Sequence, residues 1–147
     1  MTDGAFNEQT AVLLTSGQAA PPWLQAWWDE ADMIVHTIAD QGAVLAIAMR
    51  TRPRSIVLDA RGSRERQDDV IATCRRLKRD SYTAIVPVMM LVPQDRFGDA
   101  FAAGADEVLR DGVDTIEAQA RLGAMLRRSD RDTDVHPSTR LPGTREI

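Results

Sequence analysis

An aspartate at the end of a short apolar run is the first residue in this sequence that could do chemistry. Residues 56–58 are branched and apolar, Asp59 follows them, and Pro53 and Gly62 bound the stretch. Such a run is typical of a strand buried on both faces of a parallel sheet, which places Asp59 at the carboxyl end of the strand. Open α/β sheets place ligands and reactive groups at that edge. An aspartate there can also simply cap the turn that follows.

Other common active-site motifs are missing from the 147 residues. No G-x-G-x-x-G follows the first apolar run, no P-loop G-K-[ST] occurs, and no nucleophile elbow contains Ser or Cys. Cys74 is the only cysteine, so an internal disulfide and a cysteine-based metal cluster are both excluded. His36 has no second His or Cys near it and is expected on a strand face. The residues themselves therefore suggest no metal and no cofactor.

Composition indicates one globular domain. The sequence is 44% hydrophobic and 27% charged, which is typical of a chain with a single core. A net charge of −4 provides no basic field for nucleic acid or anionic membrane. No apolar run approaches the roughly 20 residues of a membrane span, and the N-terminus lacks a signal-peptide pattern. We expect a cytoplasmic protein whose partners are neither nucleic acid nor membrane.

Strand patterns alternate with helix patterns along the chain. Strands are expected at residues 10–15, 33–38, 55–59, 83–92 and 107–109. Helices are expected at about residues 23–31, 43–50, 67–79, 95–103 and 114–128. This alternation predicts an α/β fold, a (βα)5 doubly wound five-stranded parallel sheet with helices on both faces.

All three tryptophans fall within the first helix pattern, after two prolines that favour a helix start. The simplest interpretation is that they anchor the core. The alternative is that Trp23 or Trp28 extends into a partner surface, since exposed aromatic residues mark interfaces. Phe97 and Phe101, spaced four residues apart on a later helix, are further interface candidates.

The (βα)5 order with an aspartate closing the third strand resembles the receiver domain of two-component response regulators. Residues 85–92 look like the fourth strand of that family, and residues 102–109 are similar to its A-x-x-A-G-A-D-D-Y-L run. The resemblance covers roughly residues 11–128 and implies a flavodoxin-like fold. It maps the phosphoacceptor onto Asp59 and implies a histidine kinase or an adaptor protein as a partner.

Other receiver positions depart from the family pattern. Receivers hold Mg²⁺ with an acidic pair after the first strand, where this chain has Ser16 and Gly17. Val92 replaces the Thr or Ser that bonds the phosphoryl group, and Asp111 replaces a lysine. A phosphoryl group beside Asp111, without a cation, is electrostatically disfavoured.

These departures predict a degenerate receiver, or pseudo-receiver, without catalytic residues. Asp59 is expected to be a retained fold residue bonded to loop amides, and Mg²⁺ matters only if Asp59 is phosphorylated. The alternative is an active phosphoacceptor in which Asp40, Asp68 or Asp69 replaces the acidic pair.

The end of the chain carries a second resemblance. Residues 134–147 look like the opening of a diguanylate cyclase (GGDEF) domain, D-x-L-T-x-L-P-N/G-x-x-x-I, with matches at Pro137, Thr139, Leu141, Pro142, Gly143 and Ile147. The catalytic loop of that domain is not among these residues, so the chain itself is not expected to make a cyclic dinucleotide.

We therefore divide the chain into a flexible N-terminus (residues 1–9), a receiver-like domain (10–128), and a linker with the start of an output domain (129–147). The expected role is to regulate a C-terminal diguanylate cyclase-type output in c-di-GMP signalling, through a homodimer or a bound partner. A stand-alone protein-interaction adaptor is the alternative.

Overall fold

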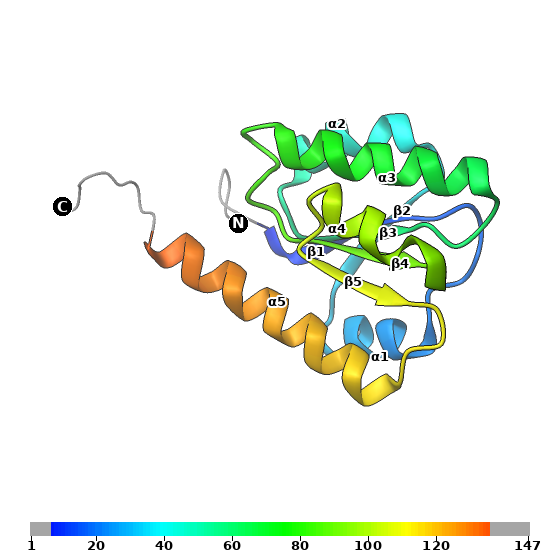
Figure 1. The fold of residues 1–147 in the computed structure, drawn as a ribbon. Helices are drawn as coiled ribbons and strands as arrows, with labels where there is room; N and C mark the ends of the chain where they lie inside the picture. The colour runs from blue at the N-terminus through cyan, green and yellow to red at the C-terminus, as the bar shows by residue number, and fades with distance from the viewer. Residues whose placement is uncertain (1–6, 136–147) are drawn as a thin grey trace.

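Five parallel strands form one sheet in the order β2-β1-β3-β4-β5 (Figure 1). The computed structural model describes the backbone of residues 7–135 and the side chains of residues 9–132. The strands are β1 (Asn7–Leu14), β2 (Ile34–Ile38), β3 (Pro53–Asp59), β4 (Val88–Val92) and β5 (Glu107–Arg110). The helices are α1 (Pro22–Glu30), α2 (Val44–Thr51), α3 (Arg64–Arg79), α4 (Phe97–Ala102) and α5 (Thr115–Val135), with 3-10 turns η1 (Gln41–Ala43) and η2 (Gln94–Arg96). The predicted flavodoxin-like (βα)5 class is confirmed.

Alternation along the central strands divides the core into two layers. Val12, Leu14 and Leu58 face the layer formed by α2, α3 and α4. Leu13 and Val57 face the opposite layer, formed by α1 and α5. Because both faces of the sheet are covered, its central strands are apolar on both sides. Figure 1 shows α1 and α5 together on one side of the sheet, with α2 and α3 on the other.

The tryptophans belong to the α1–α5 layer. Trp23 is 8% exposed and Trp28 is 3% exposed, and both pack in one cluster with Leu122 and Met125 of α5. This burial corrects the hypothesis that either side chain extends into a partner surface, because the two helices enclose them. Of the phenylalanine candidates, Phe101 remains 43% exposed.

The fourth strand is shorter than predicted. Residues 81–85 form a turn, and β4 begins only at Val88, immediately after Pro87. The Thr83 hydroxyl donates to the Leu77 carbonyl at 2.7 Å, and Lys78 Nζ donates to the Ala84 carbonyl at 2.6 Å. These bonds from the end of α3 hold the apolar residues in a turn instead of a strand.

Two helices are longer than predicted. The α3 helix begins at Arg64, three residues before the predicted start, because the Ser63 hydroxyl caps it by accepting from the Arg66 amide. The α5 helix continues to Val135, so residues 129–135 extend the helix. Arg54 of β3 supports this extension through an ion pair with Asp130 at 2.9 Å. Residues 1–6 and 136–147 lie outside the described part, so most of the stretch 134–147, with its expected resemblance to a diguanylate cyclase opening, is not described.

None of the helices within residues 7–135 combines the length and the apolar character that a membrane crossing requires.

Candidate functional site

Asp59 lies at the carboxyl edge of the sheet, in the position that the sequence predicts. Leu58 of β3 pairs with Leu14 of β1, and Asp59 pairs with Leu91 of β4. The Asp59 side chain is therefore held between the ends of two neighbouring strands, and only 1% of its surface is exposed. A carboxylate buried to this extent requires a counter-ion or several hydrogen bonds.

Arg61 supplies both. Its Nε donates to Asp59 Oδ1 at 2.9 Å, and its NH2 group donates to Asp59 Oδ2 at 2.8 Å. The Arg61 backbone amide also donates to Asp59 Oδ1, at 3.0 Å. This is the bidentate arrangement in which a guanidinium binds a carboxylate most strongly. Asp59 does bond a loop amide, but its main partner is a cation two residues further along the chain.

The same guanidinium connects the site to two other loops. Arg61 NH2 donates to the Ala19 carbonyl between β1 and α1 at 3.3 Å. Arg61 NH1 lies 3.9 Å from Asp111 Oδ1, just after β5. The hydrogen bonds to Asp59 raise the pKa of Arg61; partial burial opposes the shift, and the charges of Asp59 and Asp111 add to it. Arg61 thus carries a permanent positive charge between two carboxylates.

This arrangement corrects one expectation. The sequence suggested that no cation stands near Asp59 and Asp111, yet Arg61 contacts both. Asp111 is 65% exposed, so its charge is offset by solvent as well as by the more distant contact with Arg61.

The remaining degenerate positions are unsuited to hold a metal ion. Ser16 and Gly17 are exposed on the loop after β1 and carry no carboxylate. Val92 is fully buried at the end of β4, with only methyl groups to offer. Mg²⁺ prefers several carboxylate and water oxygens. Because both Asp59 oxygens are already bonded to Arg61, the residues present do not fit a magnesium site.

Two of the aspartates considered as replacements for the acidic pair bond to other groups. Asp40 accepts from the Gly42 amide at 2.9 Å, and Asp68 accepts from Arg96 at 2.9 Å. Across the described residues, no group of three or more His, Cys, Asp or Glu side chains is placed to hold a metal ion.

A buried arginine that the sequence did not indicate, Arg96, lies in the 3-10 turn that follows β4. Arg96 is 6% exposed and donates to Asp68 of α3, to Asp99 of α4, and to Gln67 Oε1 at 3.0 Å. Burial by itself would lower the pKa of Arg96, but the hydrogen bonds that Arg96 donates to Asp68 and Asp99, together with the charges of these carboxylates, raise the pKa. Arg96 thus fastens the loop after β4 to α3.

Comparison with known proteins gives one curated relative in sequence. No protein-family model matches the chain. The chain is 38% identical over 89 residues to the DNA-binding dual master transcriptional regulator RpaA of Synechocystis sp.. The match covers 58% of this chain and 36% of RpaA, so the chain spans about a third of that relative's length.

Solved structures are similar over most of the chain. The receiver domain of the sensor histidine kinase PA1611 from Pseudomonas aeruginosa, solved with magnesium in its active-site cleft, has a TM-score of 0.65 at 20% identity, covering 82% of this chain and 98% of that one. A receiver-modulated diguanylate cyclase from Pelobacter carbinolicus has a TM-score of 0.64 at 18% identity, covering 86% and 98%. The chemotaxis response regulator CheY4 of Vibrio cholerae has a TM-score of 0.61 at 17% identity, covering 84% and 99%. The fold is that of receiver domains.

Proposed function

We propose that this chain is a receiver-type signalling module that works without phosphoryl transfer, and that it regulates a C-terminal output through a homodimer or a bound partner. The observation that supports this most is the Asp59–Arg61 pair. A guanidinium occupies the two carboxylate oxygens that a phosphoacceptor must keep available.

The chemistry of phosphoryl transfer explains why this pair matters. An aspartate acts as a nucleophile through a free carboxylate oxygen, and the transferred group needs cations and hydrogen-bond donors around it. Here both oxygens of Asp59 accept charge-assisted bonds, and the nearby Val92 offers no donor. Attack on a phosphoryl donor would first require Arg61 to leave a buried carboxylate, which is costly.

Two observations support an output of the diguanylate cyclase type. Residues 134–147 resemble the opening of that domain, and one structural neighbour is a receiver-modulated diguanylate cyclase. The α5 helix is continuous up to Val135, within the first two residues of this stretch. The name of RpaA describes a DNA-binding regulator, but the match extends over only 36% of that protein.

Such a module would regulate its output either by forming a homodimer or by binding a kinase or an adaptor protein. Phe101 on α4 and Ile116 on α5 are 43% and 78% exposed, on elements that flank β5. Both are large apolar side chains that a second subunit or a partner could cover. Sedimentation equilibrium tests whether the protein forms a dimer. If the protein is a monomer at every attainable concentration, the homodimer is ruled out.

Phosphorylation is tested by intact mass after incubation with acetyl phosphate and Mg²⁺, with Asp59→Asn as the control. We expect no phosphoryl adduct on either protein. An adduct on the parent that is missing from Asp59→Asn would identify an active phosphoacceptor, with Arg61 as the residue that stabilises the phosphoryl group.

A further inference from the structure

Two large apolar side chains project into solvent from the turn between α3 and β4. Tyr82 is 70% exposed and Ile85 is 64% exposed, and Met49 of α2 beside them is 42% exposed. Together with Arg52 they line a hollow of about 410 Å³, which is room for several side chains. The hollow lies at the amino ends of β3 and β4, opposite the edge that carries Asp59.

The turn is ordered although its apolar side chains are exposed. Lys78 Nζ donates to the carbonyls of Ala84 and Val86, at 2.6 and 3.1 Å. Thr83 is 1% exposed, and its hydroxyl donates to the Leu77 carbonyl. An ordered turn that holds apolar side chains in water is typical of a binding surface, because a preformed site loses less entropy when it is covered.

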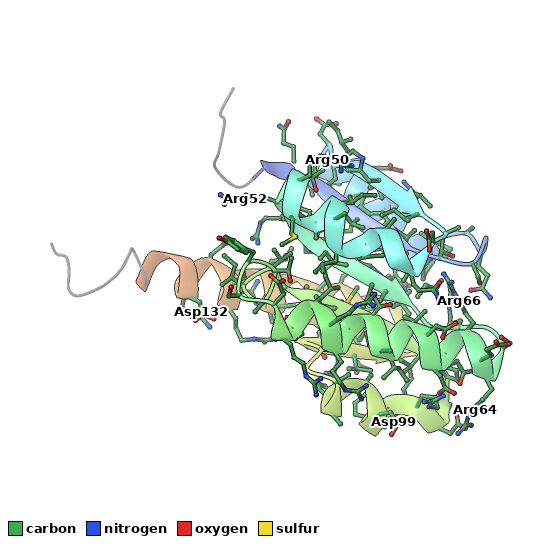
Figure 2. All side chains as sticks on the ribbon, turned by 90° about the horizontal axis from the view of Figure 1, so that it is seen from above. Arg50, Arg52, Arg64, Arg66, Asp99 and Asp132 are labelled. Atoms are coloured by element: carbon green, nitrogen blue, oxygen red, sulfur yellow. The ribbon has the colours of Figure 1, made fainter. Side chains whose placement is uncertain are left out.

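The hollow continues along the last turns of α5. A neighbouring hollow shares Ile85 and is lined also by Pro87, Met125, Arg128, Ser129 and Asp132. We call the two hollows together the α5 groove. Figure 2 shows Arg52 and Asp132 at the same end of the molecule, with Arg64 and Arg66 at the other end. The described helix ends at Val135, three residues after Asp132.

We propose that the α5 groove is the docking site for the segment of this chain that follows α5, residues 136–147. The segment follows Val135, and Asp132, three residues before Val135, lines the groove. The twelve residues of the segment can span up to about 40 Å when extended. It contains Leu141 and Ile147, two apolar side chains that could pack against the exposed Tyr82 and Ile85. Its charged residues are Arg140, Arg145 and Glu146. The arginines can pair with Asp132, and Glu146 can pair with Arg128 or Arg131 of the groove. The inference does not depend on whether Asp59 accepts a phosphoryl group.

Disulfide trapping in the full chain tests the docking. The variant Ile85→Cys/Leu141→Cys is prepared with Cys74→Ala, and its intramolecular disulfide is measured by the loss of two thiols in intact mass. The control pairs Leu141→Cys with Arg127→Cys, because Arg127 is exposed on the same part of α5 and does not line the groove. We expect the Ile85 pair to close about tenfold faster, because docking raises the effective concentration of the two thiols.

Three outcomes would overturn the proposal. Equal rates for the two pairs would mean that the segment does not rest in the groove. A disulfide that joins two chains, and that forms faster at higher concentration, would assign the groove to a second copy. Faster closure by Phe6→Cys/Ile85→Cys would assign it to the residues before β1.

Limited digestion with trypsin provides a second test that requires no cysteine variant. Docking protects the bond after Arg140, so Ile85→Asp should be cut there several-fold faster than the parent chain. Ile116→Asp, at an exposed position on the first turn of α5, should be cut at the parental rate. Equal rates for all three proteins would also overturn the docking.

Discussion

Arg61 donates to both oxygens of the Asp59 carboxylate, at 2.9 and 2.8 Å, although the two residues are separated by a single alanine. The carboxylate is 1% exposed and the arginine side chain is 21% exposed. The protein therefore carries a permanent cation bound to Asp59, the position onto which the receiver resemblance maps the phosphoacceptor. The charge of Asp59 is thus neutralised from within the chain.

Loss of Arg61 should destabilise the fold. In Arg61→Ala the Asp59 charge stays buried without its partner, and we expect the free energy of unfolding to fall by about 3 kcal/mol. Urea denaturation of Arg61→Ala, Asp59→Asn and the double variant measures the coupling between the two residues. The account predicts that the double variant loses clearly less than the sum of the single losses. Additive losses would show that the pair contributes little.

Loss of Arg96 should also be costly, whereas loss of Arg64 should not be. Arg96 is buried and bonds Asp68 and Asp99 from a 7% exposed side chain. Arg64 and Asp95 form an ion pair at 3.6 Å, but both side chains are 70% exposed. We expect Arg96→Ala to lower the free energy of unfolding by about 1–3 kcal/mol, because the buried Gln67 side chain loses its hydrogen-bond partner. We expect Arg64→Ala to change it by less than about 0.5 kcal/mol. Similar values for the two variants in urea denaturation would contradict the difference in burial.

Trp28→Ala should behave as a core truncation. Trp28 is 3% exposed between α1 and α5, so the variant should lose about 3–5 kcal/mol of stability or fail to fold. Thermal or urea unfolding gives the value, with Ile116→Ala as the exposed control, for which less than about 0.5 kcal/mol is expected. If Trp28→Ala kept full stability and lost only a partner, the tryptophan would belong to an interface after all.

Because the Cys74 thiol is buried, we expect the protein to lose stability at alkaline pH. Burial raises the pKa of the Cys74 thiol from 9.0 to about 11, although nearby Lys78 opposes the shift. Between these two values the unfolded chain releases a proton that the folded chain retains, so stability falls as pH rises through this window. A shift of this size corresponds to about 3 kcal/mol.

The control for this prediction is Cys74→Ala, because it keeps the other groups that titrate at alkaline pH. Urea midpoints measured from pH 8 upward should fall more steeply in the parent than in Cys74→Ala. Parallel curves would mean that the thiol does not contribute to the pH dependence.

The alternation of strands and helices was readable because every central strand is apolar on both faces, as for residues 56–58. The position of Asp59 at the sheet edge followed from the same pattern. The sequence could not predict that Arg61 binds Asp59, because no periodic pattern indicates where the side chain of a loop residue points. Its spacing from Asp59 and the charge reversal at Asp111 were the signals available.

The ends of several strands and helices are set by specific side-chain contacts, and a local sequence pattern does not reveal such contacts. The apolar residues around Ile85 indicated a strand, but Lys78 and Thr83 hold them in a turn. Pro87, unusual inside a strand, was the local signal that β4 begins later. Residues 129–134 have no apolar period, and Arg54, 76 positions before Asp130, supports the helix there.

The most direct measurement is a ¹H–¹⁵N spectrum of the arginine Nε–H groups, recorded with and without Mg²⁺ and acetyl phosphate. The Arg61 signal is assigned by its loss in Arg61→Lys. The account predicts a slowly exchanging Arg61 signal that Mg²⁺ and acetyl phosphate leave unchanged and that Asp59→Asn shifts. An Arg61 signal that is missing from the parent protein, or that moves when Mg²⁺ is added, would contradict the internal ion pair.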